Sequence, residues 1–370
     1  MNPARRNFLK AAGLGLGATL LTPNAWGRSH ADEKKLGIAL VGLGNYAMNK
    51  LAPAFAFAQF CELRGLVTGT PTKAEKYGAQ YGIPKENIYT YDNFDQIKDN
   101  PGIDIVYVVL PNSMHADYVI RAAEAGKHVI CEKPFDVSAA QAEKAVKACE
   151  EAGVLLQTGY RCQYDPYHLE LMRVGQNEVM GQVNFLRTNF SFYGVNNSNW
   201  RFTDKKLSGG GPLMDVGVYC IQGCRYTMGK EPVAVTARSY RFYPDKMEDV
   251  EQSIVWQFEF PNGAVADCSS SYVARSNFIE VSAENGNFGL SSAYSYSPPA
   301  GHVAGIEMNF PHDNQQAKQM DAFARNILDD TPVVADGLEG LKDMRLIEAI
   351  YASAHNNGQR IELDAELKMK

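Results

Sequence analysis

Leu36-Gly37-Ile38-Ala39-Leu40-Val41-Gly42-Leu43-Gly44-Asn45-Tyr46-Ala47 is the stretch that decides the fold. An apolar, strand-like run leads into the pattern G-x-G-x-x-A, and a helical segment follows. The two glycines allow a tight turn and a close backbone approach to a pyrophosphate, and the small Ala47 lets the helix pack on the strand. The stretch therefore predicts a dinucleotide site, with its phosphates near these residues: Gly42, Leu43, Gly44, Asn45, Tyr46 and Ala47.

Further short apolar runs, separated by amphipathic helical stretches, follow at residues 63–67, 103–110, 128–131 and 154–157. Continuous apolar strands between such helices are typical of a parallel sheet that is covered on both faces. We therefore expect a doubly wound Rossmann domain over residues 31–160.

Beyond residue 160 the pattern changes to longer alternating strands, at 183–193, 233–243, 253–260, 264–272 and 278–282. Alternation predicts a large, mostly antiparallel sheet with one open face. Residues 291–300 are loop-like, and residues 315–328 and 338–356 are predicted helices, the second packing back on the first domain. The fold class is α/β, with a C-terminal α+β domain over residues 161–370 for substrate binding and oligomerisation. The open sheet favours a homodimer or homotetramer.

Composition narrows the class of protein. The chain of 370 residues is 45% hydrophobic and 21% charged, which indicates a globular protein. Its net charge is -6 and no long run of Lys or Arg occurs, so nucleic acid is not an expected partner. The seven cysteines form no CxxC pair, so neither a metal site nor a disulfide framework is predicted.

The N-terminus has the layout of a twin-arginine export signal over residues 1–30. Arg5-Arg6-Asn7-Phe8-Leu9-Lys10 precedes a weakly apolar run at 11–21, which is too short to span a bilayer. The alternative is a basic, frayed terminus. We expect a mature protein in the periplasm, without a membrane segment and exported folded with its cofactor inside.

The end of the second predicted strand indicates which dinucleotide binds. An enzyme selective for NAD would carry Asp or Glu there, whereas this chain has Thr68-Gly69-Thr70-Pro71-Thr72-Lys73. Thr68 and Gly69 offer no carboxylate to repel a 2'-phosphate, and Lys73 adds a positive charge. The sequence predicts NADP, with a simple solvated turn as the alternative.

Leu110, Pro111, Asn112 and His115 follow the central strand, at the edge where open α/β sheets bind ligands. We expect these residues beside the cofactor, with His115 supporting the nicotinamide ribose. The alternative is that His115 only caps the next helix.

Glu132-Lys133-Pro134 follows the strand at residues 128–131 and lies at the same edge, so Glu132 and Lys133 are expected beside the cofactor. Lys133 could neutralise a developing alkoxide and lower the pKa of a neighbouring acid. The alternative is a surface lysine in a turn.

A glycine-rich turn at residues 209–211 leads into a predicted helix that carries Asp215 and Tyr219. Four residues apart, both side chains would point from one helical face. A tyrosine is a poor base at its ordinary pKa near 10, so it needs a cation such as Lys133 close by. The alternative roles are a helix cap for Asp215 and a core aromatic for Tyr219.

These motifs resemble the glucose-fructose oxidoreductase and inositol dehydrogenase family over nearly the whole chain after the signal. Most relatives carry His at the position of Tyr219, and the tyrosine resembles the glucose-fructose oxidoreductase branch, which uses NADP. The resemblance rests on these segments: 41–47, 110–115, 126–134, 159–162, 164–166, 209–219 and 345–351.

The resemblance implies that a glucose-like aldose is oxidised at C1 to the lactone while NADP takes the hydride. Tyr219 would take the C1 hydroxyl proton, Lys133 would polarise the oxygen and Asp215 would orient the sugar. The bound cofactor would then reduce a second, fructose-like sugar to a polyol. Tyr160 and Arg161 would line the sugar pocket, with these two further candidates: Trp200 and Arg201.

Two other functions stay open. The branch has a long proline-rich arm before the first strand that covers a neighbour's cofactor, and this chain has only a short segment there. That departure favours a dissociable NADP-dependent aldose dehydrogenase. The same fold also supports a sugar sensor that binds dinucleotide without turnover. The presence of Lys133, Asp215 and Tyr219 together favours an enzyme, and the periplasm's lack of free NADP favours self-recycling.

Overall fold

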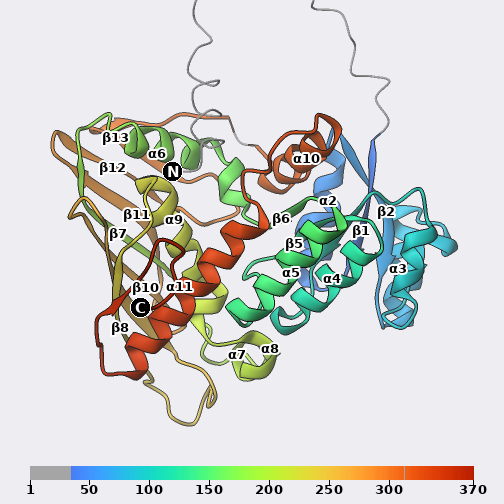
Figure 1. Ribbon diagram of the computed structural model, residues 1–370, viewed down its shortest axis with the longest axis horizontal. Coiled ribbons are helices and arrows are strands. Elements are labelled where there is room, and N and C mark those ends of the chain that lie inside the picture. The colour runs from blue at the N-terminus through green and yellow to red at the C-terminus, as the bar shows by residue number, and fades with distance from the viewer. Residues whose placement is uncertain (1–34, 312) are drawn as a thin grey trace, which may run out of the picture.

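The computed structural model describes residues 35–311 and 313–370 (Figure 1). The predicted export signal at residues 1–30 lies outside this part of the chain. Within it, no helix is both long and apolar enough to cross a membrane. Two sheets form the framework of the molecule, and several helices lie between them (Figure 1).

The first sheet has six strands in the order β3-β2-β1-β4-β5-β6, and every pair is parallel. This order belongs to doubly wound dinucleotide-binding folds, so the predicted Rossmann sheet is confirmed. The strand β3 was not predicted, because two residues are too few for a periodic pattern. The bounds are β1 Leu36–Val41, β2 Cys61–Val67, β3 Ile88–Tyr89, β4 Ile105–Val108, β5 His128–Cys131 and β6 Leu156–Thr158.

Local signals explain where the helices of this first part begin and end. The Ser138 hydroxyl accepts a hydrogen bond from the Gln141 N–H at the start of α5, and Gly153 ends that helix with φ of 66°. The helices are α2 Ala52–Ala54, α3 Pro71–Tyr81, α4 His115–Glu124 and α5 Ala139–Ala152. A π-helical turn covers Ala47–Leu51, and 3-10 turns cover Phe55–Phe57, Lys85–Asn87, Phe94–Asp99, Asn112–Met114 and Arg161–Tyr164.

The second sheet has nine strands in the order β14-β13-β12-β11-β7-β10-β9-β8-β15. All its pairs are antiparallel except β7 with β10, so the predicted large, mostly antiparallel sheet is confirmed. Burial alternates along β9, and its outward Val255 is 41% exposed, which leaves one face open. The bounds are β7 Val183–Ser191, β8 Ala234–Tyr240, β9 Ser253–Glu259, β10 Val265–Ser271, β11 Ser276–Ala283, β12 Gly286–Ser291, β13 Ala300–Val303, β14 Ile306–Glu307 and β15 Ile361–Glu362.

Two late helices join the sheets. As predicted, α11 packs against the first part of the chain at α5, and it also packs on β8 of the second sheet (Figure 1). The preceding helix α10 was not expected there, yet its Met320 and Phe323 share a core with Ile38 and Leu40 of β1. The helices after residue 160 are α6 Pro166–Gln176, α7 Trp200–Thr203, α8 Lys205–Ser208, α9 Val218–Met228, α10 Gln315–Leu328 and α11 Gly337–His355, with a π-helical turn at Leu213–Gly217.

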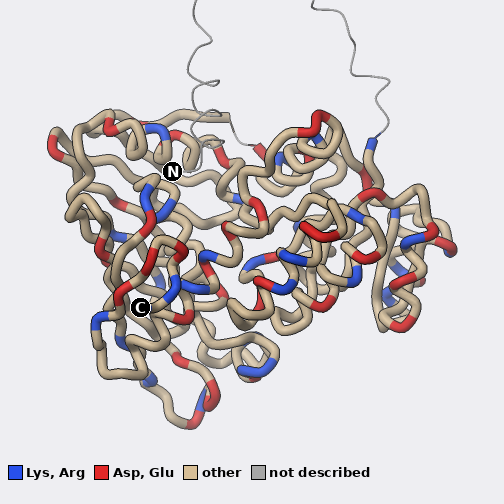
Figure 2. The backbone as a smooth tube through the Cα atoms, viewed as in Figure 1, with Lys and Arg blue, Asp and Glu red and all other residues tan. Residues whose placement is uncertain are grey.

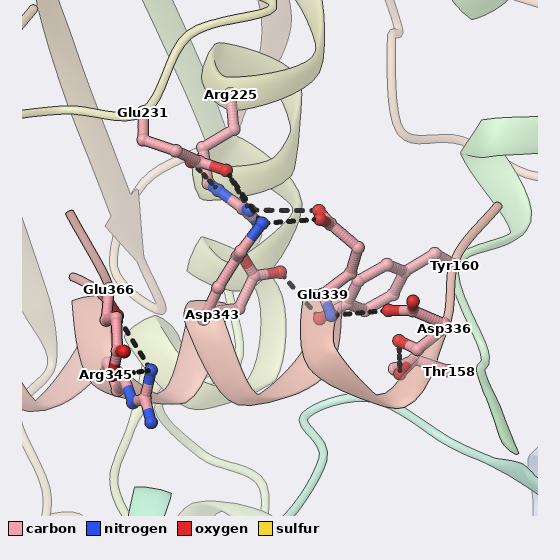
Figure 3. Close-up of polar contacts among 10 residues, drawn as sticks. Thr158, Tyr160, Arg225, Glu231, Asp336, Glu339, Asp343, Arg345 and Glu366 are labelled. Atoms are coloured by element: carbon pink, nitrogen blue, oxygen red, sulfur yellow. Dashed lines mark hydrogen bonds and ion pairs between the residues drawn. The ribbon is translucent and has the colours of Figure 1, made fainter. Parts of the chain in front are cut away.

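A buried arginine of α9 forms ion pairs with two carboxylates of α11 (Figure 3). The side chain of Arg225 is 1% exposed, and its guanidinium contacts Glu231 at 2.6 Å, Glu339 at 2.9 Å and Asp343 at 2.5 Å. The Tyr160 hydroxyl donates to the other oxygen of Asp343 at 2.6 Å. These contacts tie the chain just after β6 to two helices that it meets much later in the sequence.

Charges and thiols are otherwise spread through the molecule. Lys and Arg alternate with Asp and Glu over both halves (Figure 2). All seven cysteines are buried and unbridged. The closest sulfur pair is between Cys224 and Cys268, at 3.3 Å.

Candidate active site

The predicted residues gather at the carboxyl edge of the first sheet. The glycine loop follows β1, Thr68 follows β2, Leu110 follows β4 and Lys133 follows β5. In open α/β sheets ligands bind at this edge, where the strand order reverses between β1 and β4. The arrangement therefore brings a dinucleotide site and a candidate catalytic lysine to one place.

The glycine loop has the space that a dinucleotide needs. Gly42 has φ of 93°, and a Cβ there would lie 2.5 Å from the Val109 carbonyl oxygen, so no other residue fits without strain. A Cβ on Gly44 would meet no atom within 4 Å, which leaves an open cradle beside the start of the helix. Such a cradle fits a pyrophosphate held by backbone N–H groups. Ala47 is fully buried, as helix packing requires.

The turn after β2 lies beside this loop. Lys73 Nζ donates to the Leu43 carbonyl oxygen at 3.1 Å, which carries its charge to the glycine loop. Thr68 is buried, and its hydroxyl oxygen accepts from the Thr70 N–H at 3.2 Å. A Cβ on Gly69 would lie 3.0 Å from the Tyr91 ring. The turn offers a hydroxyl and an ammonium, and no carboxylate, to a ribose 2'-substituent.

His115 and Asn112 hold two loops in place. The two ring nitrogens of His115 face the carbonyl oxygens of Leu110 and Pro134, each at 2.9 Å. Burial lowers the pKa of His115 to about 4, so the ring is neutral and donates to one of them. Asn112 donates to the Ser208 carbonyl oxygen at 2.8 Å. His115 thus joins the loop after β4 to the Glu-Lys-Pro turn, and its support of the nicotinamide ribose stays a prediction.

Glu132 points into the protein and lies below the site. Its carboxylate accepts from the Tyr107 hydroxyl at 2.8 Å, and Gln319 of α10 donates to that hydroxyl at 2.7 Å. Burial raises the pKa of Glu132, against the attraction of Lys133. The bond between Lys133 and Pro134 is cis.

The structure brings Lys133, Asp215 and Tyr219 together. Lys133 Nζ donates to the Asp215 backbone oxygen at 2.6 Å, lies 4.0 Å from its carboxylate Oδ1, and lies 4.7 Å from the centre of the Tyr219 ring. Burial lowers the pKa of Lys133 to about 8, although Asp215 opposes the change. A cation and a carboxylate thus face a phenol across the junction of the two sheets.

The helix that carries Asp215 and Tyr219 differs from the prediction. Residues Leu213–Gly217 form a π-helical turn, and α9 starts only at Val218, so the two side chains do not share one regular α-helix. Such turns occur often at functional sites. Glu251 binds the start of the turn, because its carboxylate accepts from the N–H groups of Gly211 and Leu213 at 2.9 and 3.2 Å.

Two residues hold the Asp215 carboxylate. The Tyr272 hydroxyl donates to Oδ2 at 3.1 Å, and Arg201 Nη1 lies 3.6 Å from Oδ1. Arg201 was only a possible contributor from the sequence, and its side chain is 44% exposed, so it also faces solvent. Its guanidinium lies 5.5 Å from the Trp200 ring. Tyr272 was missed, although the inward alternation of β10 continues to this position.

Tyr160 and Arg161 do not form the expected open pocket lining. Tyr160 is 1% exposed, and its hydroxyl binds Asp343 instead of facing Lys133 (Figure 3). Arg161 is also 1% exposed, and its Nε donates to the Tyr219 hydroxyl oxygen at 3.2 Å. We correct both roles: the two side chains turn into the protein, because acceptors for them lie there.

Tyr296 is a further residue that the sequence did not reveal. It lies in the loop between β12 and β13, and its ring is 4.5 Å from the Arg161 guanidinium and 4.5 Å from Lys50 Nζ. Lys50 belongs to the helix after the glycine loop. The prediction for residues 291–300 was a loop without a role, and no motif marks this tyrosine.

Comparisons with known proteins agree with this geometry. Residues 36–160 match the oxidoreductase family with an NAD-binding Rossmann fold, and residues 168–288 match the GFO/IDH/MocA C-terminal domain. The chain is similar to D-xylose 1-dehydrogenase [NADP(+)] of Haloarcula marismortui, 27% identical over 89% of this chain and 94% of that one. A second D-xylose 1-dehydrogenase (NADP(+)), from Haloferax volcanii, is 29% identical over 88% and 99%.

A solved structure is more similar still. The aldose-aldose oxidoreductase of Caulobacter crescentus, complexed with glycerol, is 39% identical and superimposes with a TM-score of 0.86, over 89% of this chain and all of that one. The family matches cover the whole first sheet and the second sheet from β7 into β12. The chain belongs to the GFO/IDH/MocA family of oxidoreductases.

Proposed function

We propose that this protein uses NADP to oxidise the anomeric CH-OH group of an aldose to a lactone and then passes the hydride to a second sugar. The observation that carries the proposal is the meeting of Lys133, Asp215 and Tyr219 beside the glycine loop. The names of the relatives support the substrate class, because they are D-xylose 1-dehydrogenases with NADP(+) and an aldose-aldose oxidoreductase.

The residues around the glycine loop fit the cofactor. Gly44 leaves the cradle for the pyrophosphate, and Lys73 supplies a positive charge for a 2'-phosphate. When bound, NADP supplies the group that accepts a hydride from one sugar and returns it to another. The protein supplies binding, orientation and proton transfer.

The chemistry of the chain's own residues follows from their contacts. Lys133 stabilises the negative charge that develops on the sugar O1, and Asp215 accepts a hydrogen bond from a neighbouring hydroxyl. Tyr219 takes the O1 proton as the lactone carbonyl forms. In the second half-reaction Tyr219 returns that proton to the carbonyl oxygen of the acceptor sugar, which becomes a polyol.

The decisive experiment is mass spectrometry of the supernatant after native protein is denatured. Retained NADP at about one molecule per chain supports the self-recycling reaction. Absorbance then identifies the substrates: reduced cofactor should lose its nicotinamide absorbance with fructose or an aldose acceptor and regain it with glucose or xylose. A spectrum that does not change across a panel of aldoses and ketoses contradicts the proposal and favours a sugar sensor.

A second candidate is a dissociable NADP-dependent aldose dehydrogenase. The observation in its favour is that two similar relatives are named as D-xylose 1-dehydrogenases with NADP(+). The same measurement separates the two functions, because protein purified without NADP that turns over only with added cofactor is a dissociable dehydrogenase.

We also propose a periplasmic, oligomeric protein. The paired Arg5 and Arg6 before an apolar run support folded export, and the open face of the second sheet supports a dimer or tetramer. Replacing both arginines by lysine should leave the precursor in the cytoplasm, and light scattering should give the number of subunits. Unchanged export or a monomer would contradict these two points separately.

A further inference from the structure

The cation that meets the Tyr219 hydroxyl is Arg161. Its Nε–H donates to the phenol oxygen at 3.2 Å, whereas Lys133 lies over the ring face and donates its own hydrogen bond to the Asp215 backbone. A hydrogen bond from a charged donor stabilises charge on the acceptor oxygen directly. Arg161, more than Lys133, is therefore placed to stabilise a negative Tyr219 oxygen.

Arg161 is buried with no carboxylate bound to it in the described part of the chain. Its other N–H groups donate to the carbonyl oxygens of Tyr294 at 2.5 Å and Ser295 at 3.1 Å, and to the Gln315 side chain. Arg225 is equally buried, yet it contacts three carboxylates. Buried charges are normally paired with an opposite charge. A negative charge on the Tyr219 oxygen would give the buried Arg161 guanidinium such a partner.

The other groups around Tyr219 do not supply that pairing. Glu132 attracts Arg161, but its carboxylate is bound to the Tyr107 hydroxyl and to the Lys133 N–H. Burial raises the pKa of Tyr219, and Arg161 is the main group that lowers it. The titratable or charged groups near Tyr219 on the packed elements, besides Arg161, are Tyr46, Glu132, Lys133, Cys162, His168, Asp215, Tyr294 and Tyr296.

Cys162 and His168 lie on the inner side of Tyr219, where all three line one small cavity with room for about a single water. Burial alone would lower the pKa of His168, but Cys162 outweighs it and raises it to about 8. Burial opposes ionisation of the Cys162 thiol, but Arg161 first and His168 second lower its pKa. Cys162 is hydrogen-bonded to His168, whereas the Tyr219 oxygen accepts its hydrogen bond from Arg161.

We propose that Arg161 is a positioning residue for proton transfer, as the counter-ion of the Tyr219 phenolate that takes the sugar O1 proton. As the new phenol O–H bond forms, the sugar O1–H bond breaks, and the guanidinium is left beside a neutral phenol. This inference rests on the proposed function for its sugar, but the pairing of Arg161 with Tyr219 can be tested without any sugar.

The test places 3-fluorotyrosine at position 219 and follows its ionisation by fluorine NMR in protein stripped of cofactor. Arg161→Met should move this ionisation to higher pH by at least about one pH unit, a tenfold change in the ionised fraction. The matched control carries 3-fluorotyrosine at position 351, a partly buried tyrosine whose hydroxyl donates to Glu251 and which has no contact with Arg161. An equal ionisation pH at position 219 with and without Arg161 overturns the inference.

Two further measurements keep the test decisive. If Arg161→Met does not fold, as judged by circular dichroism, Arg161→Lys takes its place. It keeps the charge but not the Nε–H, so it should give a smaller upward shift, and no shift contradicts the inference. In loaded enzyme, Arg161→Met should slow single-turnover oxidation at least tenfold with little change in KM. An NMR shift without any sugar turnover would refute the proposed function and leave the pairing standing.

Discussion

Lys133 is the residue whose charge the chemistry depends on most directly. Burial lowers its pKa to about 8, so most molecules carry the ammonium at neutral pH and few do at pH 9. The neutral amine cannot stabilise a developing negative oxygen. We expect the single-turnover rate of aldose oxidation to fall as pH rises through about 8. In Lys133→Arg this fall should move to higher pH, because a guanidinium stays charged there. A fall that stays at the same pH in Lys133→Arg would assign it to another group.

Tyr219 is the proposed proton acceptor, so removing its hydroxyl should stop turnover without emptying the cofactor site. We expect Tyr219→Phe to retain NADP and to lose about 10²- to 10⁴-fold in rate, which is the usual contribution of a positioned acid or base. Tyr164→Phe is the matched control, since that hydroxyl binds Gln157. Rapid-mixing absorbance and NADP content measure both effects. Turnover within a few-fold of the unaltered enzyme would remove Tyr219 from the mechanism.

The sequence predicted the reacting groups better than the residues that hold them. Lys133, Asp215 and Tyr219 lie in recognisable turns, and the topology of a doubly wound sheet brings such turns together. The direction of Arg161 depends on carbonyl groups of Tyr294 and Ser295, more than a hundred residues away. No local pattern records contacts of that kind.

The loop between β12 and β13 crosses from the second sheet to the dinucleotide-binding helix. Tyr296 lies between the cations of Arg161 and Lys50, and such contacts each contribute about 0.5 to 2 kcal/mol. We expect Tyr296→Ala to release NADP faster, by roughly tenfold. Cofactor fluorescence after dilution measures the release rate. Tyr243→Ala, a half-exposed tyrosine in another loop, should not change it. Equal release from both variants would show that this loop does not retain the cofactor.

Elements were predictable where a periodic pattern is long enough. The runs at 36–41, 128–131 and 315–328 coincide with β1, β5 and α10. Five strands were missed: β3, β13, β14 and β15 have only two to four residues, and β12 has two glycines among its six residues and no regular alternation. The π-helical turn was missed because its cause is tertiary: Gly217 packs against the Ser270 hydroxyl, and Glu251 binds the first N–H groups.

At the scale of the whole molecule, the two sheets are joined by helices from the end of the chain. The sequence predicted both helices and the packing of the second on the first domain, but not that α10 covers β1 or that α11 also packs on β8. The Arg225 cluster of α9 and α11 lies at this junction and also binds Tyr160 (Figure 3). Removing one partner of a buried ion cluster leaves the other charges unpaired and is usually strongly destabilising.

Two carboxyl groups of the Arg225 cluster, Glu231 and Asp343, should change the free energy of unfolding in opposite directions as the pH falls. Burial alone would raise the pKa of Glu231, but Arg225 outweighs it and holds that pKa at about 2, so this stabilisation is present above about pH 4.5 and lost as pH falls toward 2. Burial raises the pKa of Asp343 to about 6, although the nearby Arg225 acts to lower it. Protonated Asp343 is therefore favoured by folding, and its contribution is full below about pH 4 and lost as pH rises through 6.

Chemical unfolding at a series of pH values separates the two responses. The free energy of unfolding of the unaltered protein should fall as the pH is lowered from 4.5 to 2. In Glu231→Gln this fall should be smaller, by up to roughly 3 kcal/mol. In Asp343→Asn the free energy of unfolding should instead change less between pH 4 and 6, and its fall below pH 4 should remain. Because each variant removes one titration and keeps nearly the same shape, the two curves should differ from the unaltered protein in separate pH ranges. Parallel curves for all three proteins would mean that Arg225 does not couple α9 to α11 electrostatically.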